Sequence, residues 1–159
     1  MAVLTFYGAA QEVTGSCYLL ESPAIGRILL DCGVRQGGDA IERVQEEGFL
    51  FDPASIDAVI LSHAHLDHSG MLPMLINQGF AGAIYCTQAT KGLLRILLED
   101  ASGLYHRDIE HENLRRARSG RPALEAEYSE KDVDAVINAC AHKGAMLCRH
   151  KQGNKGSFT

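Results

Sequence analysis

The sequence predicts a protein of the α/β or α+β class with a mixed β-sheet, and two observations lead to this prediction. Three short apolar runs of β type follow one another near the N-terminus, and strand–helix alternation begins only after them. A meander that continues into strand–helix–strand units gives a sheet with antiparallel and parallel pairs. The chain has 159 residues, 46% of them hydrophobic. It is therefore long enough to bury the core of about one domain.

The apolar runs and the turn signals between them predict the elements in order. Strands are expected at residues 3–7, 17–20, 27–30, 56–61 and 83–86, and residues 22–26 form a turn between the second and third strands. Helices are expected at residues 37–47, 71–78, 87–118 and 129–140. Ser129, with Asp132 three residues later, has the pattern of a capping box at the start of the last helix.

The two halves of the helix expected at residues 87–118 differ in character. The first half carries four leucines at the spacing of a buried face: Leu93, Leu94, Leu97 and Leu98. The second half, from His106 on, is charged almost throughout, and we expect it to be solvated together with His106 and His111. Its arginines could contact phosphate, although a solvated helix face is the simpler interpretation.

Composition and charge exclude several classes of protein. No apolar run approaches the roughly 20 residues that span a bilayer. The N-terminus also lacks the basic region of a secretory signal. The five cysteines are scattered without a CxxC pair, which indicates reduced thiols and a cytoplasmic protein. The net charge of −5 argues against a domain built mainly to grip nucleic acid, but it does not exclude a nuclease, because bound metals supply local positive charge.

A cluster of histidines directly after the strand at residues 56–61 is the strongest indication of a functional site in the sequence. His63, His65, Asp67 and His68 fall within six residues, just past the end of a buried strand, where ligand sites of α/β sheets tend to lie. The plain alternative is a polar loop that caps a helix, with Asp67 as the N-cap residue. Three neighbouring imidazoles have little purpose in a mere turn, whereas each neutral ring is a good zinc donor.

The spacing of this cluster predicts two metal ions rather than one. His63 and His65, two apart in an extended segment, project to the same side. Asp67 and His68, adjacent at a helix start, point elsewhere, so one ion cannot readily use all four groups. Two ions about 3.5–4 Å apart can, and this is the geometry of hydrolytic two-metal sites. Imidazole and carboxylate ligands without thiolate suit Zn²⁺, with Mn²⁺ or Fe²⁺ as alternatives.

These motifs resemble a known family. The segment 63–68 (HAHLDH) after an apolar strand is similar to the HxHxDH motif of the metallo-β-lactamase fold, and residues 30–33 (LDCG) resemble the family's first motif. Residues 8–18 (GAAQEVTGSCY) look like the opening loop of the β-CASP branch, the RNA-processing nucleases of this fold. Residues 69–73 and the long helix after Thr87 fit the same branch. The resemblance implies an αββα sandwich, of which residues 1–140 would form the N-terminal half, with a mixed sheet and flanking helices.

The resemblance also implies a role for each residue of the site. His63 and His65 would bind a first metal, and Asp67 and His68 a second. Asp31 would support the site from outside the metal ligands by fixing the tautomer of an imidazole. Asp67 would also act in catalysis by holding or deprotonating the metal-activated hydroxide that attacks phosphorus. The cofactors would be two Zn²⁺ ions per complete site, with Mn²⁺ as an alternative, and the substrate would be RNA.

Other groups that this family uses come later in its sequences and are missing here. After His68 the chain has only His106, His111, His142 and His150, and the charge and helical period change abruptly near Ala141. We therefore expect the N-terminal part of a longer protein that ends in a foreign or out-of-frame, disordered basic tail at residues 141–159. We expect this chain alone to be inactive and to self-associate through an uncovered sheet.

Two other functions remain open at this point. A hydrolase of thioesters or small esters would use the same fold and the same metals. A non-catalytic metal-binding or interaction module would use the cluster without turnover. In all three cases we expect a cytoplasmic protein with no membrane partner.

Overall fold

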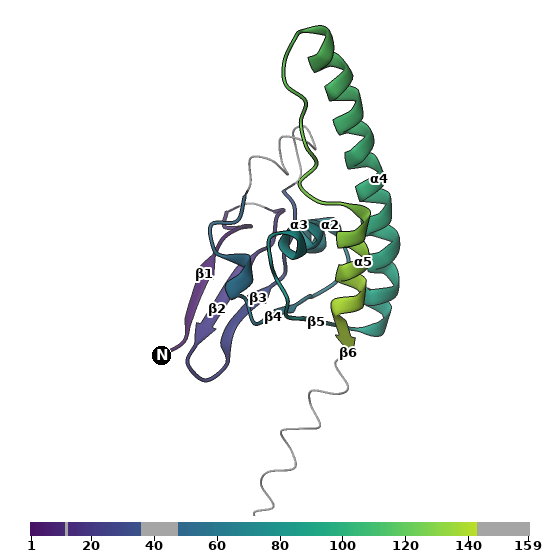
Figure 1. Cartoon of the computed structure of the whole chain (residues 1–159). Helices are drawn as coiled ribbons and strands as arrows, with labels where there is room; N and C mark the ends of the chain where they lie inside the picture. The colour runs from purple at the N-terminus through teal and green to yellow at the C-terminus, as the bar shows by residue number, and fades with distance from the viewer. Residues whose placement is uncertain (12, 36–47, 143–159) are drawn as a thin grey trace, which may run out of the picture.

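A six-stranded mixed sheet forms the base of the molecule (Figure 1). The computed structural model describes residues 1–11, 13–35 and 48–142. The strands lie side by side in chain order: β1 (Val3–Phe6), β2 (Tyr18–Ser22), β3 (Gly26–Leu30), β4 (Ala58–Ile60), β5 (Ala83–Cys86) and β6 (Cys140–His142). The pairs β1–β2 and β2–β3 are antiparallel, and the three pairs from β3 to β6 are parallel. The expected α/β class with a mixed sheet is confirmed.

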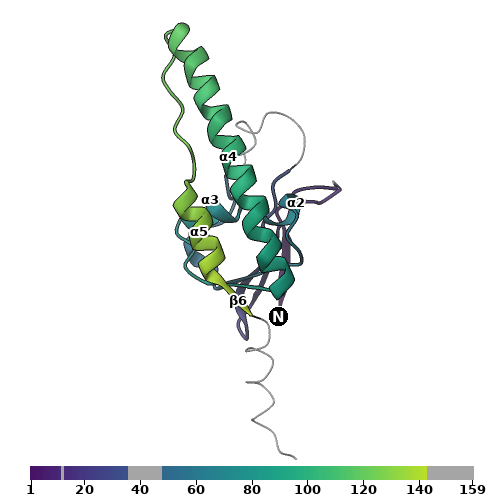
Figure 2. The same ribbon diagram turned by 90° about the vertical axis from the view of Figure 1, so that its right-hand side faces the viewer.

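The helices come from the crossovers between the parallel strands. They are the 3-10 helix η1 (Pro53–Ser55) and the α-helices α2 (Leu66–Ser69), α3 (Leu72–Asn77), α4 (Gln88–Arg118) and α5 (Glu130–Ala139). Parallel neighbours need such crossovers, and crossovers of one hand place their helices on one face of the sheet. Figures 1 and 2 show α3 and α5 beside the parallel strands and α4 running past them far beyond the sheet.

The core lies between this helical layer and one row of strand residues. Leu19, Leu29, Val59 and Ile84 are successive cross-strand partners, and each has 0% of its surface exposed. Because strand side chains alternate between the two faces, the whole row points toward the helices. Leu72 and Leu75 of α3, Leu94 and Leu98 of α4, and Val136 of α5 pack into the same core. This row therefore joins the antiparallel and the parallel halves of the sheet.

The opposite face of the sheet is apolar, and no helix of the described residues packs against it. The neighbouring row runs from Phe6 through Tyr18, Leu30 and Ile60 to Tyr85, again as successive cross-strand partners. Phe6 is 60% and Ile60 46% exposed. An apolar face of this extent favours association with another apolar surface.

Most of the elements expected from the sequence form, with a few differences. Ser129 and Asp132 make the expected capping box, and the strand at residues 83–86 has the expected bounds. β6 was not expected, and it includes Ala141 and His142, which lie past the change in composition. The helix expected at residues 37–47 and the tail from residue 143 on lie outside the described residues. No helix in the described part of the chain is long and apolar enough to cross a membrane.

Two expectations for α4 are wrong. Leu93 is 47% exposed, because the buried stripe of the helix follows Leu94, Leu98 and Tyr105. His106 is not freely solvated: its Nδ1 lies 2.7 Å from the carbonyl oxygen of Ser102 and its Nε2 3.1 Å from that of Tyr128. A segment that returns along the helix provides the second contact.

The four cysteines within the described residues are buried free thiols, as the scattered spacing suggests: Cys17, Cys32, Cys86 and Cys140. Burial raises the pKa of the Cys32 thiol well above its ordinary value, and burial together with the neighbouring Cys86 raises that of Cys140 to about 12. Both groups therefore stay protonated near neutral pH and are unreactive as nucleophiles.

The uncovered face predicts self-association of this chain. Replacing Phe6 and Ile60 together by lysine places charge on that face and should shift the protein toward monomer in sedimentation velocity experiments. The matched double replacement Ile96→Lys/Leu104→Lys, at two exposed positions of α4, should leave the association unchanged. A wild-type protein that sediments as a single monomer at all concentrations would contradict this prediction.

Candidate metal centre

Two segments that are distant in sequence meet at the carboxyl edge of the parallel strands. Asp31 directly follows β3, Ser62 and His63 follow β4, and Asp67 and His68 lie on α2. Ligand sites of α/β sheets form at this edge, because the loops that leave adjacent parallel strands lie next to one another there. The order of the strands thus brings the residues of two expected motifs to one place.

Asp31 lies at the centre of a hydrogen-bond network. The backbone nitrogen of Ser62 donates to Oδ1 at 2.8 Å. The Ser62 hydroxyl donates to Oδ2 at 2.9 Å, and the Ser16 hydroxyl donates to it at 3.2 Å. Nδ1 of His68 lies 2.8 Å from the same oxygen. The residue has a positive φ of 58°, a conformation that aspartate and asparagine tolerate better than most residues.

This network determines which nitrogen of His68 is free to bind a cation. An ionised carboxylate can only accept hydrogen bonds, so the proton between His68 and Asp31 belongs to Nδ1. The Nε2 atom of His68 then keeps its lone pair, and it faces Oδ2 of Asp67 at 3.5 Å. A carboxylate that fixes the tautomer of a ligating histidine is a frequent feature of metal sites.

Ser62 determines in the same way which nitrogen of His63 is free. Its only hydroxyl proton is donated to Asp31, so its oxygen accepts a hydrogen bond from Nδ1 of His63 at 3.0 Å. The Nε2 atom of His63 is then also free. Asp31 thus orients one imidazole directly and a second through Ser62.

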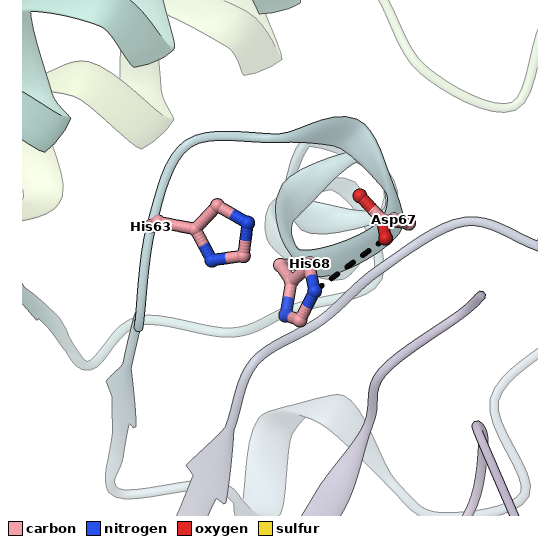
Figure 3. Close-up of side chains that lie close together, drawn as sticks. All are labelled: His63, Asp67 and His68. Atoms are coloured by element: carbon pink, nitrogen blue, oxygen red, sulfur yellow. Dashed lines mark ion pairs between the residues drawn. The ribbon is translucent and has the colours of Figure 1, made fainter. Parts of the chain in front are cut away.

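The potential ligand atoms of His63, Asp67 and His68 converge. They lie within 4.8 Å of one another, and all three residues are half-buried. Figure 3 shows the rings of His63 and His68 facing each other, with Asp67 beside them on α2, and the ring centroids are 4.0 Å apart. The nitrogen and oxygen donors of this group, and its location at the strand ends, fit a divalent cation.

His65 lies beside this group without being part of it. Its ring is edge-on to that of His63, with centroids 4.8 Å apart, and its side chain is exposed. Its backbone forms the N-cap of α2, with Asp67 in the first turn of that helix. The alternative in which Asp67 serves as the N-cap is therefore wrong. The side chain of Asp67 is free to face His68 instead.

The opening loop and the segment after β3 hold α2 through backbone contacts. The nitrogen of Ser16 donates to the Asp67 carbonyl at 2.8 Å, and that of Cys32 donates to the His68 carbonyl at 2.8 Å. A β-carbon at Gly33 would lie 1.7 Å from the Asp67 carbonyl oxygen, so only glycine fits at this position. The opening loop and the LDCG segment, which both resemble the family, thus position the residues of the HAHLDH segment.

Two residues of the site, Ser16 and Ser62, were not singled out from the sequence. Serine is a common residue and rarely binds metal ions. The only signal that could have identified Ser62 is its position next to the HAHLDH segment. Ser16 lies in the opening loop, and only the fold shows that it reaches Asp31.

Comparison with known proteins shows the family. The model described as the metallo-beta-lactamase superfamily matches residues 10–117, which is more than half of the chain. The chain therefore belongs to the metallo-beta-lactamase superfamily, and the assignment made from its motifs is confirmed. Members of this superfamily bind divalent metal ions, and the His63–Asp67–His68 group is where the described residues could hold one.

Several relatives have names from RNA biology. Ribonuclease TTHA0252 of Thermus thermophilus is 52% identical over 95 residues, which cover 60% of this chain and 21% of that protein. Transcription termination factor FttA of Methanosarcina mazei is 36% identical over 154 residues, which cover 91% of this chain and 23% of that protein. These names are consistent with the β-CASP branch. The chain spans about a fifth of the length of these relatives.

A solved structure of a B3 metallo-beta-lactamase with an active-site glutamic acid is also similar to this chain. It shares 22% sequence identity with a TM-score of 0.40, and the alignment covers 58% of this chain and 32% of that chain.

The network around Asp31 predicts a large effect of the substitution Asp31→Asn on metal affinity. Asparagine tolerates the positive φ, so the backbone is kept, but its amide can no longer anchor both Ser62 and His68 as a carboxylate does. Zinc affinity, measured by competition with a chromophoric chelator, should fall by about 10–100-fold.

The control for this measurement is Asp57→Asn, which also removes one carboxylate charge but directly precedes β4, at the edge of the sheet opposite to the metal centre. It should keep the wild-type affinity for zinc. Equal zinc affinity of the Asp31→Asn protein and the wild type would show that Asp31 does not orient the ligands.

Proposed function

We propose that this chain is the N-terminal, metal-binding part of a β-CASP ribonuclease that hydrolyses RNA phosphodiesters with two zinc ions. One observation carries the proposal: the His63–Asp67–His68 group lies at the strand ends of a chain that is 52% identical, over 95 residues, to a protein named ribonuclease. The opening loop that resembles the β-CASP branch supports the RNA substrate over other substrates of the fold.

The ligand roles are those that the resemblance implies. His63 and His65 hold the first ion, and Asp67 and His68 hold the second, with Mn²⁺ as the alternative to Zn²⁺. The free Nε2 atoms of His63 and His68 support this assignment, as does the position of the exposed His65 ring beside His63. Asp31 binds no metal and acts as the positioning residue for His63 and His68.

The chain's own residues contribute orientation and proton transfer to the reaction. Bound divalent cations supply an activated water nucleophile and stabilise negative charge on the phosphoryl oxygens. The Asp67 carboxylate faces the same space as the Nε2 atom of His68, where it can hold the attacking water and accept its proton. Asp31 and Ser62 keep the imidazoles in place, so that little reorganisation is needed during the reaction.

Metal binding by this chain alone should be weak. A catalytic zinc ion usually has three protein ligands and a water molecule, and the described residues offer two for each of two ions. We therefore expect little or no turnover from this chain. A cytoplasmic location is in keeping with the free, buried cysteines.

Metal content tests the site directly. Wild-type protein dialysed to equilibrium against a fixed concentration of free Zn²⁺ should bind zinc, and the double substitution His63→Ala/His65→Ala should lower the number of ions per chain by at least half in elemental analysis. The control His106→Ala/His111→Ala removes two histidines from α4 and should retain the wild-type content. Equal zinc content in all three proteins would contradict the proposed ligands.

Substrate preference tests the reaction. The longest form of the protein that its gene encodes should cleave labelled RNA in the presence of zinc, and Asp67→Asn should reduce the rate by at least 100-fold with RNA binding retained, since proton transfer and metal binding are both affected. Cleavage of a thioester panel without RNA cleavage would indicate the esterase alternative. Stoichiometric zinc with neither activity would indicate a non-catalytic metal-binding module.

A further inference from the structure

The C-terminal third of α4 and the chain that follows it form an arm that extends beyond the sheet. We define the arm as residues 109–128. α4 has 31 residues, which corresponds to a length of about 46 Å. Figures 1 and 2 show the helix projecting past the other elements and the return segment running back along it to α5.

Specific contacts hold the arm together. The side-chain amide of Asn113 donates to the Leu124 carbonyl at 3.0 Å and accepts from the Leu124 nitrogen at 2.7 Å. At the tip, Gly120 has a positive φ of 66° and Arg121 donates a backbone hydrogen bond to the Arg116 carbonyl at 3.0 Å, which ends the helix and reverses the chain. At the base, the rings of Tyr105 and Tyr128 stack with centroids 5.0 Å apart. The arm is therefore an ordered hairpin.

The tip of this hairpin has too few carboxylates for its arginines. Residues 111–122 contain four arginines and one acidic residue, Glu112, a local surplus of three positive charges in an arm that is neutral as a whole, because its base also carries Glu110, Glu125 and Glu127. Three of the arginines converge on that carboxylate, at 3.6 Å from Arg115, 3.3 Å from Arg116 and 3.5 Å from Arg121. One carboxylate cannot neutralise three guanidinium groups, so donors remain free for another anion.

Helix electrostatics explain only part of this surplus. Cations in the last turn interact favourably with the helix dipole, which accounts for arginines at positions 115, 116 and 118. Arg121 lies beyond the end of the helix, and the reversal of the chain brings it back to Glu112. The side chains of Arg115 and Arg121 are 79% and 56% exposed. The tip therefore presents guanidinium groups from both sides of the turn to solvent.

The helix that carries the arm starts at the edge of the sheet that carries the metal centre. α4 begins directly after β5, on the carboxyl edge where Asp31 and His63 also lie, and it passes beside α2. We propose that the arm is a docking element for the phosphate backbone of single-stranded RNA. This proposal rests on the proposed function, and it assigns to the arginine tip the binding of substrate phosphates outside the metal centre. Guanidinium forks bind phosphate oxygens in a bidentate manner, and the local surplus of positive charge at the tip complements a polyanion.

The test compares RNA binding by three proteins in fluorescence anisotropy, with a fluorescein-labelled single-stranded oligouridylate as the probe. EDTA is present, so that no metal contributes. The arm variant is Arg115→Gln/Arg118→Gln/Arg121→Gln, which keeps Arg116 because its guanidinium donates to the Pro122 carbonyl and supports the turn. The control variant is Arg95→Gln/Arg107→Gln/Lys131→Gln, which removes the same charge from exposed positions outside the tip.

The wild type and the control variant should bind the oligouridylate with the same salt dependence. The arm variant should bind more weakly, and the slope of log K against log salt concentration should be smaller in magnitude by about 2, as expected for three lost phosphate contacts on a single strand. An equal loss in both variants would show an effect of net charge alone and would overturn the proposal. No binding by the wild type would also overturn it.

A second variant works in the opposite direction. Glu112→Gln keeps the hydrogen-bond acceptor that Arg116 uses but removes the only negative charge of the tip. It should tighten binding several-fold, and unchanged or weaker binding in a folded protein would contradict the proposal. Competition by polyglutamate as strong as that by RNA would point to an acidic protein partner and would also overturn it.

The two proposals fail in different ways. If RNA binding depends on the arm but no form of the protein cleaves RNA, the proposed function is wrong and the docking element stands. If the protein cleaves RNA and all arm variants bind and cleave it as the wild type does, only the docking element is wrong.

Discussion

The hydrogen bond between Asp31 and His68, together with the chain Asp31–Ser62–His63, is the constraint on which the candidate site depends. Because a carboxylate only accepts and a serine hydroxyl has one proton, these contacts place the protons of both imidazoles on Nδ1. Both Nε2 atoms are then free on the side of Asp67. The backbone at Asp31 has a positive φ, so the turn after β3 and the chemistry of the site depend on the same residue.

The sheet provides the frame for this arrangement. The buried row from Leu19 to Ile84 fixes β3 and β4 against the helical layer, so that the residues following these two strands meet at one edge. The backbone hydrogen bonds from Ser16 and Cys32 then fix α2 against the same edge. The candidate ligands are thus positioned by elements that carry no metal chemistry, and the fit at Gly33 explains why the first motif cannot carry a larger residue there.

Local sequence patterns predicted the fold class, most of the elements and the proximity of His63, Asp67 and His68, because these depend on periodicity and on residue type. What they missed depends on contacts between distant segments. The short strand β6 forms because it pairs with β5, and His106 is held because residues 119–128 return along α4. Leu93 and Leu94 both fit the spacing of an apolar face, and only the packing of α4 determines that Leu94 is buried and Leu93 exposed. In the site, the partners of Asp31 could be inferred only in part, since Ser16 reaches it across the fold.

The most direct test of the account is a long-range nitrogen–proton NMR measurement of the histidine tautomers in metal-free protein. The account predicts that His63 and His68 both carry their proton on Nδ1, and that added Zn²⁺ shifts the Nε2 resonances of these two residues while the Nδ1 protons remain in place. Protonation of either ring on Nε2, or zinc-induced shifts confined to other histidines, would contradict the claim that Asp31 and Ser62 prepare these two imidazoles for a divalent cation.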